Sequence, residues 1–227
     1  MNERQENLLS KIIEDYIRTV IPVASDYLVK KYKLKVSGAT VRNDCQYLEK
    51  RGFLTHPHIS AGRVPTEKGY RYYVLRSQNK GIVLEDTRYL DVVYNQVGGL
   101  GTRDKVKYVA KAVAELVDGA VIVGFAKSDS YYTGLSYLFS QPEFKNHDLV
   151  YNITAVVDHL DEVIASVYDE MSDDVIVKIG SENPFGVDCS FVGVRHKDGL
   201  FGLLGPMRMD YMSNISRVKY TKSLLFE

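Results

Sequence analysis

Residues 37–50 carry side chains that could read a nucleic acid, at a spacing that a helix would bring together. At about 100° per residue, three apolar side chains fall on one face, and a small residue, two carboxamides and a cation fall on the opposite face. The inner residues are Val41, Cys45 and Leu48, the outer residues are Ala39, Asn43, Gln46 and Lys50, Thr40 and Tyr47 lie on one shoulder, and Arg42 lies on the other. Carboxamides can pair with adenine edges in the major groove, and cations can contact guanine or phosphate. An ordinary solvent-exposed face carries the same residue types, and this helix taken alone favours that alternative.

The residues after this helix favour DNA binding. Residues 53–56 are typical of a strand and residues 63–65 of its return, and the proline and glycine within 57–62 supply a turn. A two-stranded wing behind a helix-turn-helix places Arg63, and with it His58, beside the phosphate backbone. His56 and His58 stand two residues apart, a spacing that hints at a metal, but no further ligands lie nearby and we predict no metal site.

Helices must precede the wing to position these side chains. Apolar residues recur at steps of three and four from Leu8 to Val20, which predicts an amphipathic helix that ends before Pro22. Ser25 is predicted to cap a short second helix over residues 26–32.

The third and fourth helices have their own start and stop signals. Ser37 is predicted to cap a helix that runs to about Lys50, and Gly52 follows where a helix C-terminus favours glycine. Thr66 is predicted to cap a fourth helix over residues 67–76. The outward-facing cations of that helix are Lys68 and Arg71. Helices joined by short turns in this order match a helix-turn-helix core.

The net charge of zero hides a division along the chain. Residues 1–80 hold 15 Lys and Arg against 8 Asp and Glu, a charge of +7, and residues 81–227 hold 14 against 21, a charge of −7. A basic front half suits a polyanionic partner. The chain has two cysteines, no apolar stretch long enough to span a bilayer and no secretion signal, which predicts a soluble cytoplasmic protein without a membrane partner.

The acidic half is predicted to be an α+β domain in which helices pack on one face of an antiparallel sheet. The predicted helices cover residues 84–97, 103–118 and 149–168, and the predicted strands cover 120–124, 175–179, 188–196 and 200–204, the last two forming a hairpin across 197–199. The glycines within 98–101 follow a helix and lack the Gly-Lys-Ser/Thr ending, so they predict a turn and not a phosphate-binding loop.

Catalysis has little support in this half. Its three histidines, His147, His159 and His196, have no neighbouring nucleophile partner, and Cys189 lies mid-strand, where a core thiol is expected. The acidic residues between 158 and 174 lack calcium-loop spacing and follow a helical rhythm, which is typical of a solvated face. We therefore predict no enzyme activity, no cofactor and no metal.

Several linked motifs together resemble the HrcA family of heat-inducible transcription repressors. In the basic half they are Ser37-Gly-Ala-Thr-Val-Arg-Asn-Asp44, Leu48-Glu49, Pro57-His-Ile-Ser-Ala-Gly-Arg-Val-Pro-Thr66 and Gly69-Tyr-Arg-Tyr-Tyr-Val74. In the acidic half they are Gly134-Leu-Ser136, Ser140-Gln-Pro-Glu-Phe144, Ile179-Gly-Ser-Glu-Asn-Pro184 and Leu204-Gly-Pro-Met-Arg-Met-Asp-Tyr211. The set is spread from the third helix almost to the C-terminus, which makes the resemblance far more specific than a helix-turn-helix alone.

The resemblance implies a dimeric repressor that binds an inverted repeat upstream of chaperone operons. It also implies a winged-helix N-terminal domain, a GAF-like C-terminal domain and dependence on the GroE chaperonin, whose occupation by unfolded protein on heat stress leaves the repressor inactive. Three departures stand out. Gly38 replaces a usual proline, Ile59 replaces a usual threonine, and residues 119–125 run almost directly into the Gly134 motif, where the family usually has a long middle section associated with dimer contacts.

We expect a winged-helix DNA-binding domain over residues 1–80, a connecting helix and turn over 81–105, and a GAF-like regulatory and dimerisation domain over 106–227. The residues expected to contact double-stranded DNA are Ser37, Ala39, Thr40, Arg42, Asn43, Gln46, Tyr47, Lys50, His58, Ser60, Arg63, Lys68 and Arg71. The alternative function is a winged-helix regulator whose C-terminal domain senses a small-molecule effector.

Overall fold

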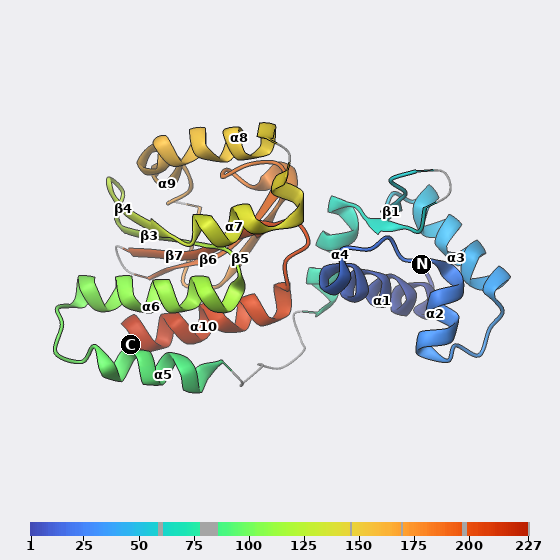
Figure 1. Ribbon diagram of the computed structural model, residues 1–227, viewed down its shortest axis with the longest axis horizontal. Helices are drawn as coiled ribbons and strands as arrows, with labels where there is room; N and C mark the ends of the chain where they lie inside the picture. The colour runs from blue at the N-terminus through green and yellow to red at the C-terminus, as the bar shows by residue number, and fades with distance from the viewer. Residues whose placement is uncertain (59–60, 78–85, 146, 169, 197–198, 227) are drawn as a thin grey trace. The chain divides into compact units, whose positions relative to one another are not determined.

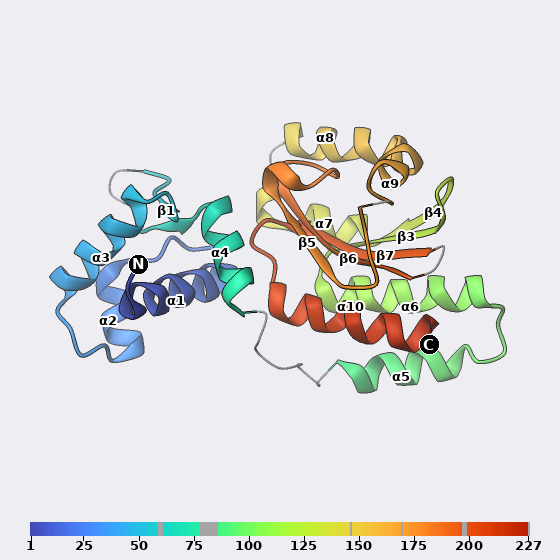
Figure 2. The ribbon, with the colours of Figure 1, turned by 180° about the vertical axis from the view of Figure 1, so that it is seen from behind.

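The computed structural model describes residues 1–58, 61–77, 86–145, 147–168, 170–196 and 199–226, without the side chains of residues 147, 148, 151, 152 and 167. The chain folds into two compact units, residues 1–79 and residues 80–227, drawn in Figures 1 and 2. No helix among the described residues combines the length and apolar composition needed to cross a lipid bilayer.

The first unit consists of three helices, a two-stranded hairpin and a fourth helix. These elements are α1 (Glu3–Thr19), α2 (Ser25–Tyr32), α3 (Gly38–Lys50), β1 (Leu54–Thr55), β2 (Val64–Pro65) and α4 (Glu67–Ser77). The strands pair antiparallel, with Thr55 opposite Val64. We call this hairpin with its turn, residues 53–65, the wing. Each helix and strand predicted for this half of the chain is present.

The helix ends are confirmed with one exception. The Ser37 hydroxyl accepts a hydrogen bond from the Thr40 amide at 3.2 Å and caps α3. Gly52 follows α3 with a φ of 75°, a left-handed conformation that favours glycine. The prediction for Ser25 is wrong, because Ser25 is the first residue of α2 and Ala24 occupies the cap position without a side-chain hydrogen bond. The buried Ser25 side chain is instead hydrogen-bonded with Cys45 of α3.

The second unit is built on a five-stranded antiparallel sheet of order β4-β3-β7-β6-β5. Its strands are β3 (Ala120–Ala126), β4 (Asp129–Thr133), β5 (Ile176–Ile179), β6 (Cys189–His196) and β7 (Gly199–Pro206). Its helices are α5 (Thr87–Gln96), α6 (Thr102–Val117), α7 (Leu135–Ser140), α8 (His147–Asp158), α9 (Leu160–Tyr168) and α10 (Tyr211–Phe226), with short 3-10 turns η1 (Pro142–Lys145) and η2 (Gly180–Glu182). The start of the predicted helix at 84–85 and the hairpin turn at 197–198 lie outside the described residues.

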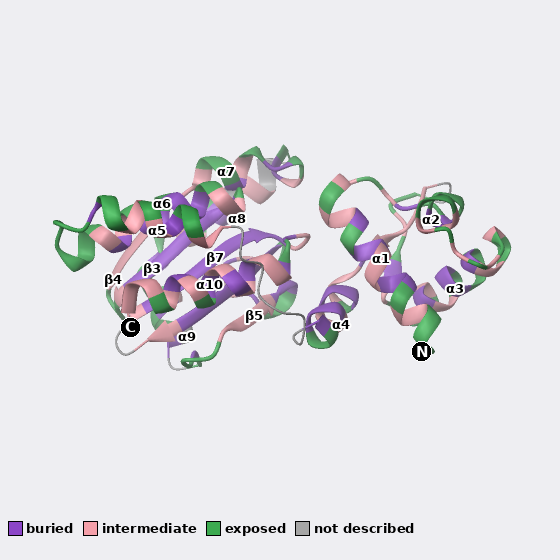
Figure 3. Ribbon diagram, turned by 90° about the horizontal axis from the view of Figure 1, so that it is seen from below, coloured by how far each residue is buried: buried purple, intermediate pink, exposed green. Residues whose placement is uncertain are grey.

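Helices cover both faces of this sheet, so the prediction of one covered face is wrong. Helices α7, α8 and α9 lie over one face, and α6 and α10 lie over the other (Figure 1). Helix α10 crosses strands β6 and β7 when the unit is seen from below (Figure 3). Adjacent residues Val121, Ile122 and Val123 of β3 are all buried, as expected for a strand covered on both sides. The α+β class itself is confirmed.

Two further differences concern helices and an edge strand. The single helix predicted over residues 149–168 is two helices, α8 and α9, separated at His159. The apolar rhythm continues across this break, and Ile153 of α8 and Ile164 of α9 both enter the same core. Strand β4 and helices α7 and α10 lay outside the predicted elements, since they are short, polar or weakly periodic.

A phenylalanine ring explains two glycines at the centre of the sheet. Gly193 of β6 and Gly202 of β7 stand opposite each other in the register. The ring of the fully buried Phe191 lies over both, so that a Cβ on either residue would overlap its atoms. The sheet therefore needs glycine at both positions.

Gly202→Ala is expected to lower the free energy of unfolding of the second unit by about 1–3 kcal/mol, because the added methyl overpacks the core against Phe191. Urea unfolding of the full chain followed by circular dichroism measures this loss. Gly99→Ala is the matched control, since nothing lies within 4 Å of a Cβ at residue 99. Equal unfolding midpoints for the two variants would contradict the packing argument.

Candidate nucleic-acid interface

The outer face of α3 is open to solvent in the first unit. The exposed residues are Ala39, Arg42, Asn43, Gln46 and Lys50, and the half-buried shoulder residues are Thr40 and Tyr47. The residues of the opposite face are at most 1% exposed; they are Val41, Cys45 and Leu48. The amphipathic division predicted for this helix is confirmed, and the polar side chains of its outer face are not used in the unit's own core.

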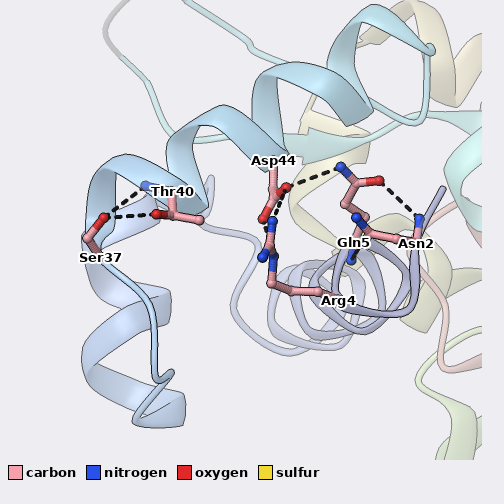
Figure 4. Close-up of polar contacts among 6 residues, drawn as sticks. All are labelled: Asn2, Arg4, Gln5, Ser37, Thr40 and Asp44. Carbon is pink, nitrogen blue, oxygen red and sulfur yellow. Dashed lines mark hydrogen bonds and ion pairs between the residues drawn. The ribbon is translucent and has the colours of Figure 1, made fainter.

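The first turn of α3 is held by its own side chains. The Ser37 and Thr40 hydroxyls lie 3.0 Å apart and the Ser37 hydroxyl also accepts from the Thr40 amide (Figure 4). Both hydroxyls were predicted to contact DNA. The structure assigns them a capping role at the end of the helix, and their contact with DNA stays a prediction.

A buried carboxylate on α3 is tied to helix α1. The Asp44 carboxylate accepts hydrogen bonds from Arg4 Nε at 2.7 Å, Arg4 Nη2 at 3.1 Å and Gln5 Nε2 at 3.1 Å (Figure 4). Its side chain is 7% exposed, whereas that of Arg4 is 53% exposed. Burial opposes ionisation of Asp44, but the hydrogen bonds from Arg4 and Gln5 and the charge of Arg4 outweigh it, and the pKa of Asp44 lies below its ordinary value.

Asp44 was not singled out by the sequence analysis. Asp44 follows Asn43 directly and therefore lies at the border of the inner and outer faces of α3, where its charge is typical of a solvated residue. No local signal marks its burial, because its partners Arg4 and Gln5 stand on the first turn of α1, 40 and 39 residues away in the chain.

A second buried carboxylate ties α1 to α2. Asp15 is 1% exposed and forms an ion pair with Lys31 of α2 and another with Arg18 Nη2 at 2.6 Å. The pair with Lys31 holds α2 against α1, and α2 leads directly into the turn before α3. The three helices thus position one another through paired charges as well as through the apolar core.

The wing residues differ in how far they reach solvent. His58 is exposed, whereas the Arg63 side chain is only 12% exposed and its Nη2 lies 3.5 Å from Glu49 Oε2. Ile59 and Ser60, two positions of interest in the wing, lie outside the described residues. Nε2 of His56 lies 2.5 Å from Oε1 of Glu49.

The two α4 cations predicted to contact DNA, Lys68 and Arg71, have partners within the unit. Lys68 is exposed, donates to the Arg51 carbonyl at 2.8 Å and lies 4.7 Å from the centre of the Phe53 ring. Arg71 is half-buried and forms an ion pair with Glu67 one turn earlier. Both remain predicted DNA contacts.

Neither the described thiols nor the described acidic groups form a nucleophilic or metal-binding site. Cys45 and Cys189 are both free and buried, and burial, with the charges of Asp188 and Glu143, raises the pKa of the Cys189 thiol to about 12. A thiol with that pKa stays protonated at neutral pH and is a poor nucleophile. Within the described ranges, no three His, Cys, Asp or Glu side chains are grouped closely enough to hold a metal ion.

These observations define a two-unit protein, with a helical unit that exposes a polar helix beside a β-hairpin and an α+β unit with a helix-covered antiparallel sheet. The sequence profile described as the HrcA protein C terminal domain matches residues 77–215, more than half of the chain. The chain belongs to the HrcA family.

Similar proteins support this assignment in both halves. The heat-inducible transcription repressor HrcA of Chloroflexus aurantiacus is 54% identical over 74 residues, which make up 33% of this chain and 20% of that protein. The repressor of the same name from Carboxydothermus hydrogenoformans is 26% identical over 334 aligned positions, covering 100% of this chain and 98% of the relative. A solved structure described as a hypothetical protein has a TM-score of 0.78 at 16% identity and covers 99% of each chain, which shows the same fold.

The full-length alignment also shows how short this chain is. It contains 334 positions and this chain has 227 residues, so at least 107 positions of the Carboxydothermus protein have no counterpart here. The missing middle section inferred from the motif spacing is consistent with this difference. The higher-identity match spans only a fifth of the Chloroflexus protein.

Asp44→Asn is expected to destabilise the first unit by about 1–3 kcal/mol, because it removes the charged acceptor of three hydrogen bonds from a buried site. Hydrogen exchange of the α1 and α3 amides in the full chain measures the loss. Glu3→Gln, an exposed change on α1, is the control and should leave exchange unaltered. An unaffected Asp44→Asn variant would mean that the network does not hold α3.

The same carboxylate predicts a pH dependence. Because the folded-state pKa of Asp44 is below its unfolded value of about 3.9, its contribution is complete above that value and is lost as the pH falls through the lower, folded-state pKa. The stability difference between the unaltered protein and Asp44→Asn should therefore be constant near neutrality and shrink below about pH 4. A difference that grows on acidification would contradict this sign.

Proposed function

We propose that this chain is a DNA-binding transcriptional repressor of heat-shock (chaperone) operons, which binds an inverted-repeat operator as a homodimer and is released on heat stress. The observation that carries this proposal is the outer face of α3, which stays exposed while its opposite face and its Asp44 anchor are buried. Membership of the HrcA family and the printed names of its relatives support the link to heat-inducible repression. The proposal is one of binding and not of catalysis, and it makes the protein a cytoplasmic one.

In this proposal α3 enters the major groove of DNA. The small Ala39 leads, Asn43 and Gln46 offer carboxamides to base edges, and Lys50 contacts phosphate or guanine. The wing lies beside the flanking backbone, with His58 among its exposed side chains. Two copies related by a two-fold axis would read half-sites about 34–36 Å apart, one turn of the double helix.

The chaperone operons and the chaperonin enter through family membership. The resemblance implies that the GroE chaperonin keeps the repressor active and that unfolded protein competes for it on heat stress. The shorter middle part of this chain makes the contact with the chaperonin a prediction in its own right. Binding of the chaperonin to the full chain, followed by light scattering, is the direct measurement.

Asn43→Ala is expected to cost about 1–3 kcal/mol of binding to a duplex selected from a random library, and to relax base preference at one position of each half-site. The reason is that a carboxamide paired to a base edge carries sequence information. Competition titrations with single-base variants of the duplex measure both effects. Asn95→Ala, an exposed asparagine of the second unit, is the matched control. Unchanged preference in Asn43→Ala would remove α3 from the reading of bases.

Binding should weaken steeply with salt. If each protomer neutralises about four phosphates, the logarithm of the affinity of a dimer should fall against the logarithm of salt with a slope near −7. Titrations of the selected duplex and of a scrambled duplex over a salt series provide the slope. Equal affinity for both duplexes would defeat the specific-repressor proposal, and sedimentation showing only monomers on the selected duplex would defeat the dimer.

A further inference from the structure

One carboxylate at the end of α3 contacts the residues that flank the two strands of the wing. Glu49 lies in the last turn of the helix, and its Oε1 is 2.5 Å from Nε2 of His56, which follows β1. Its Oε2 is 3.5 Å from Nη2 of Arg63, which precedes β2. We call these three side chains the Glu49 cluster.

The cluster is largely removed from solvent. The side chains of Glu49, His56 and Arg63 are 27%, 31% and 12% exposed. Ion pairs between fully exposed residues contribute little, because water and salt screen them. Arg63 and Glu49 are partly buried opposite charges, so their attraction is screened less, and removing one leaves the other desolvated.

The backbone around Arg63 is also anchored to the segment between α1 and α2. Arg63 and Val23 exchange two backbone hydrogen bonds, each 2.9 Å long. A Cβ on Gly62 would lie 2.5 Å from the Pro22 carbonyl oxygen, so only glycine allows this close approach. Arg63 is therefore held by Val23 through its backbone and by Glu49 through its guanidinium.

These contacts change the role expected for Arg63. A side chain that is 12% exposed and directed at Glu49 presents little of its guanidinium to a phosphate. Lys50, by contrast, follows Glu49 on α3 and is exposed. The charge of Arg63 is used inside the unit, while neighbouring cations remain at the surface.

We propose that Glu49 is a positioning residue that fixes the wing against α3, with Arg63 as its internal partner and not as a phosphate contact. This inference rests on the proposed function, because its effect on binding is the alignment of wing and helix on one duplex. Each half-site would then be read by α3 and the wing as a single rigid surface.

Hydrogen exchange of the free, full-length protein tests the positioning role without DNA. Glu49→Ala is expected to speed exchange of the Val23 and Arg63 amides about tenfold while leaving the Cys45 amide of α3 unchanged. Glu3→Ala removes the same charge from an exposed site on α1 and should change none of these rates. Val23 and Arg63 amides that exchange at their original rates in Glu49→Ala would overturn the inference.

A milder variant covers the case in which Glu49→Ala unfolds the whole unit, which faster exchange of the Cys45 amide would reveal. Glu49→Gln loses the charge but keeps an acceptor for His56, so it should speed the Arg63 amide by about threefold. The same Arg63 rate in Glu49→Gln and in the unaltered protein would then overturn the inference.

DNA binding separates positioning from simple charge. Glu49→Ala should lose about tenfold in affinity for the selected duplex, while its affinity for a scrambled duplex should follow that of Glu3→Ala. If Glu49→Ala and Glu3→Ala raised the affinity for the selected and the scrambled duplex by the same factor, Glu49 would act through its charge alone. That result would overturn the proposal.

The salt dependence of Arg63→Gln decides the role of the arginine. The proposal predicts weaker specific binding with an unchanged slope, whereas loss of a phosphate contact would make the slope less negative by about 0.9 per protomer. That smaller slope would overturn the internal role of Arg63. If the unaltered protein prefers no duplex, the proposed function fails, and the exchange rates still decide whether Glu49 holds the wing.

Discussion

The interaction on which the first unit depends is the ion pair between the buried Asp44 carboxylate and the half-exposed Arg4. A carboxylate that is 7% exposed must be satisfied inside the protein, and Arg4 and Gln5 together supply three hydrogen bonds to it. Because these donors stand on the first turn of α1, they fix the rotation of α3 about its own axis. That rotation determines which side chains of α3 face solvent, and the proposed function depends on it.

The two units use charge in different ways. In the first, acidic residues are few and several of them are committed to internal cations, as Asp15, Asp44 and Glu49 are, so the surface keeps its basic character. In the second, the core of a doubly covered sheet supplies the stability, and Phe191 occupies the space that the paired glycines leave. Helix α5, within the stretch expected to connect the domains, packs against α6 and α10 of the second unit.

The sequence predicted the first unit well because its signals are local. Ser37 and Gly52 mark the ends of α3, and the apolar residues of α3 repeat at helical steps, so both the helix and its exposed face could be found. Contacts between distant residues were beyond such signals. No residue near Arg63 in the chain indicates that Glu49 will bind it. The apolar spacing continues from Ile153 to Ile164, so it does not indicate the helix break at His159. Helix α10 was missed for the related reason that its apolar side chains do not form one stripe.

The hairpin of β3 and β4 has a consequence for how this family varies in length. The chain reverses between Ala126 and Asp129, which are paired in the register. The two strands therefore end next to each other at the turn that joins them. Opening a connection at such a place adds only the entropy of closing a longer loop, which grows by about 0.6 kcal/mol for each doubling of length. The resemblance to the family predicts that the absent section would lie between residues 125 and 134, where this hairpin stands. A whole domain could thus be gained or lost there during evolution while the strand pairing on either side stays as it is.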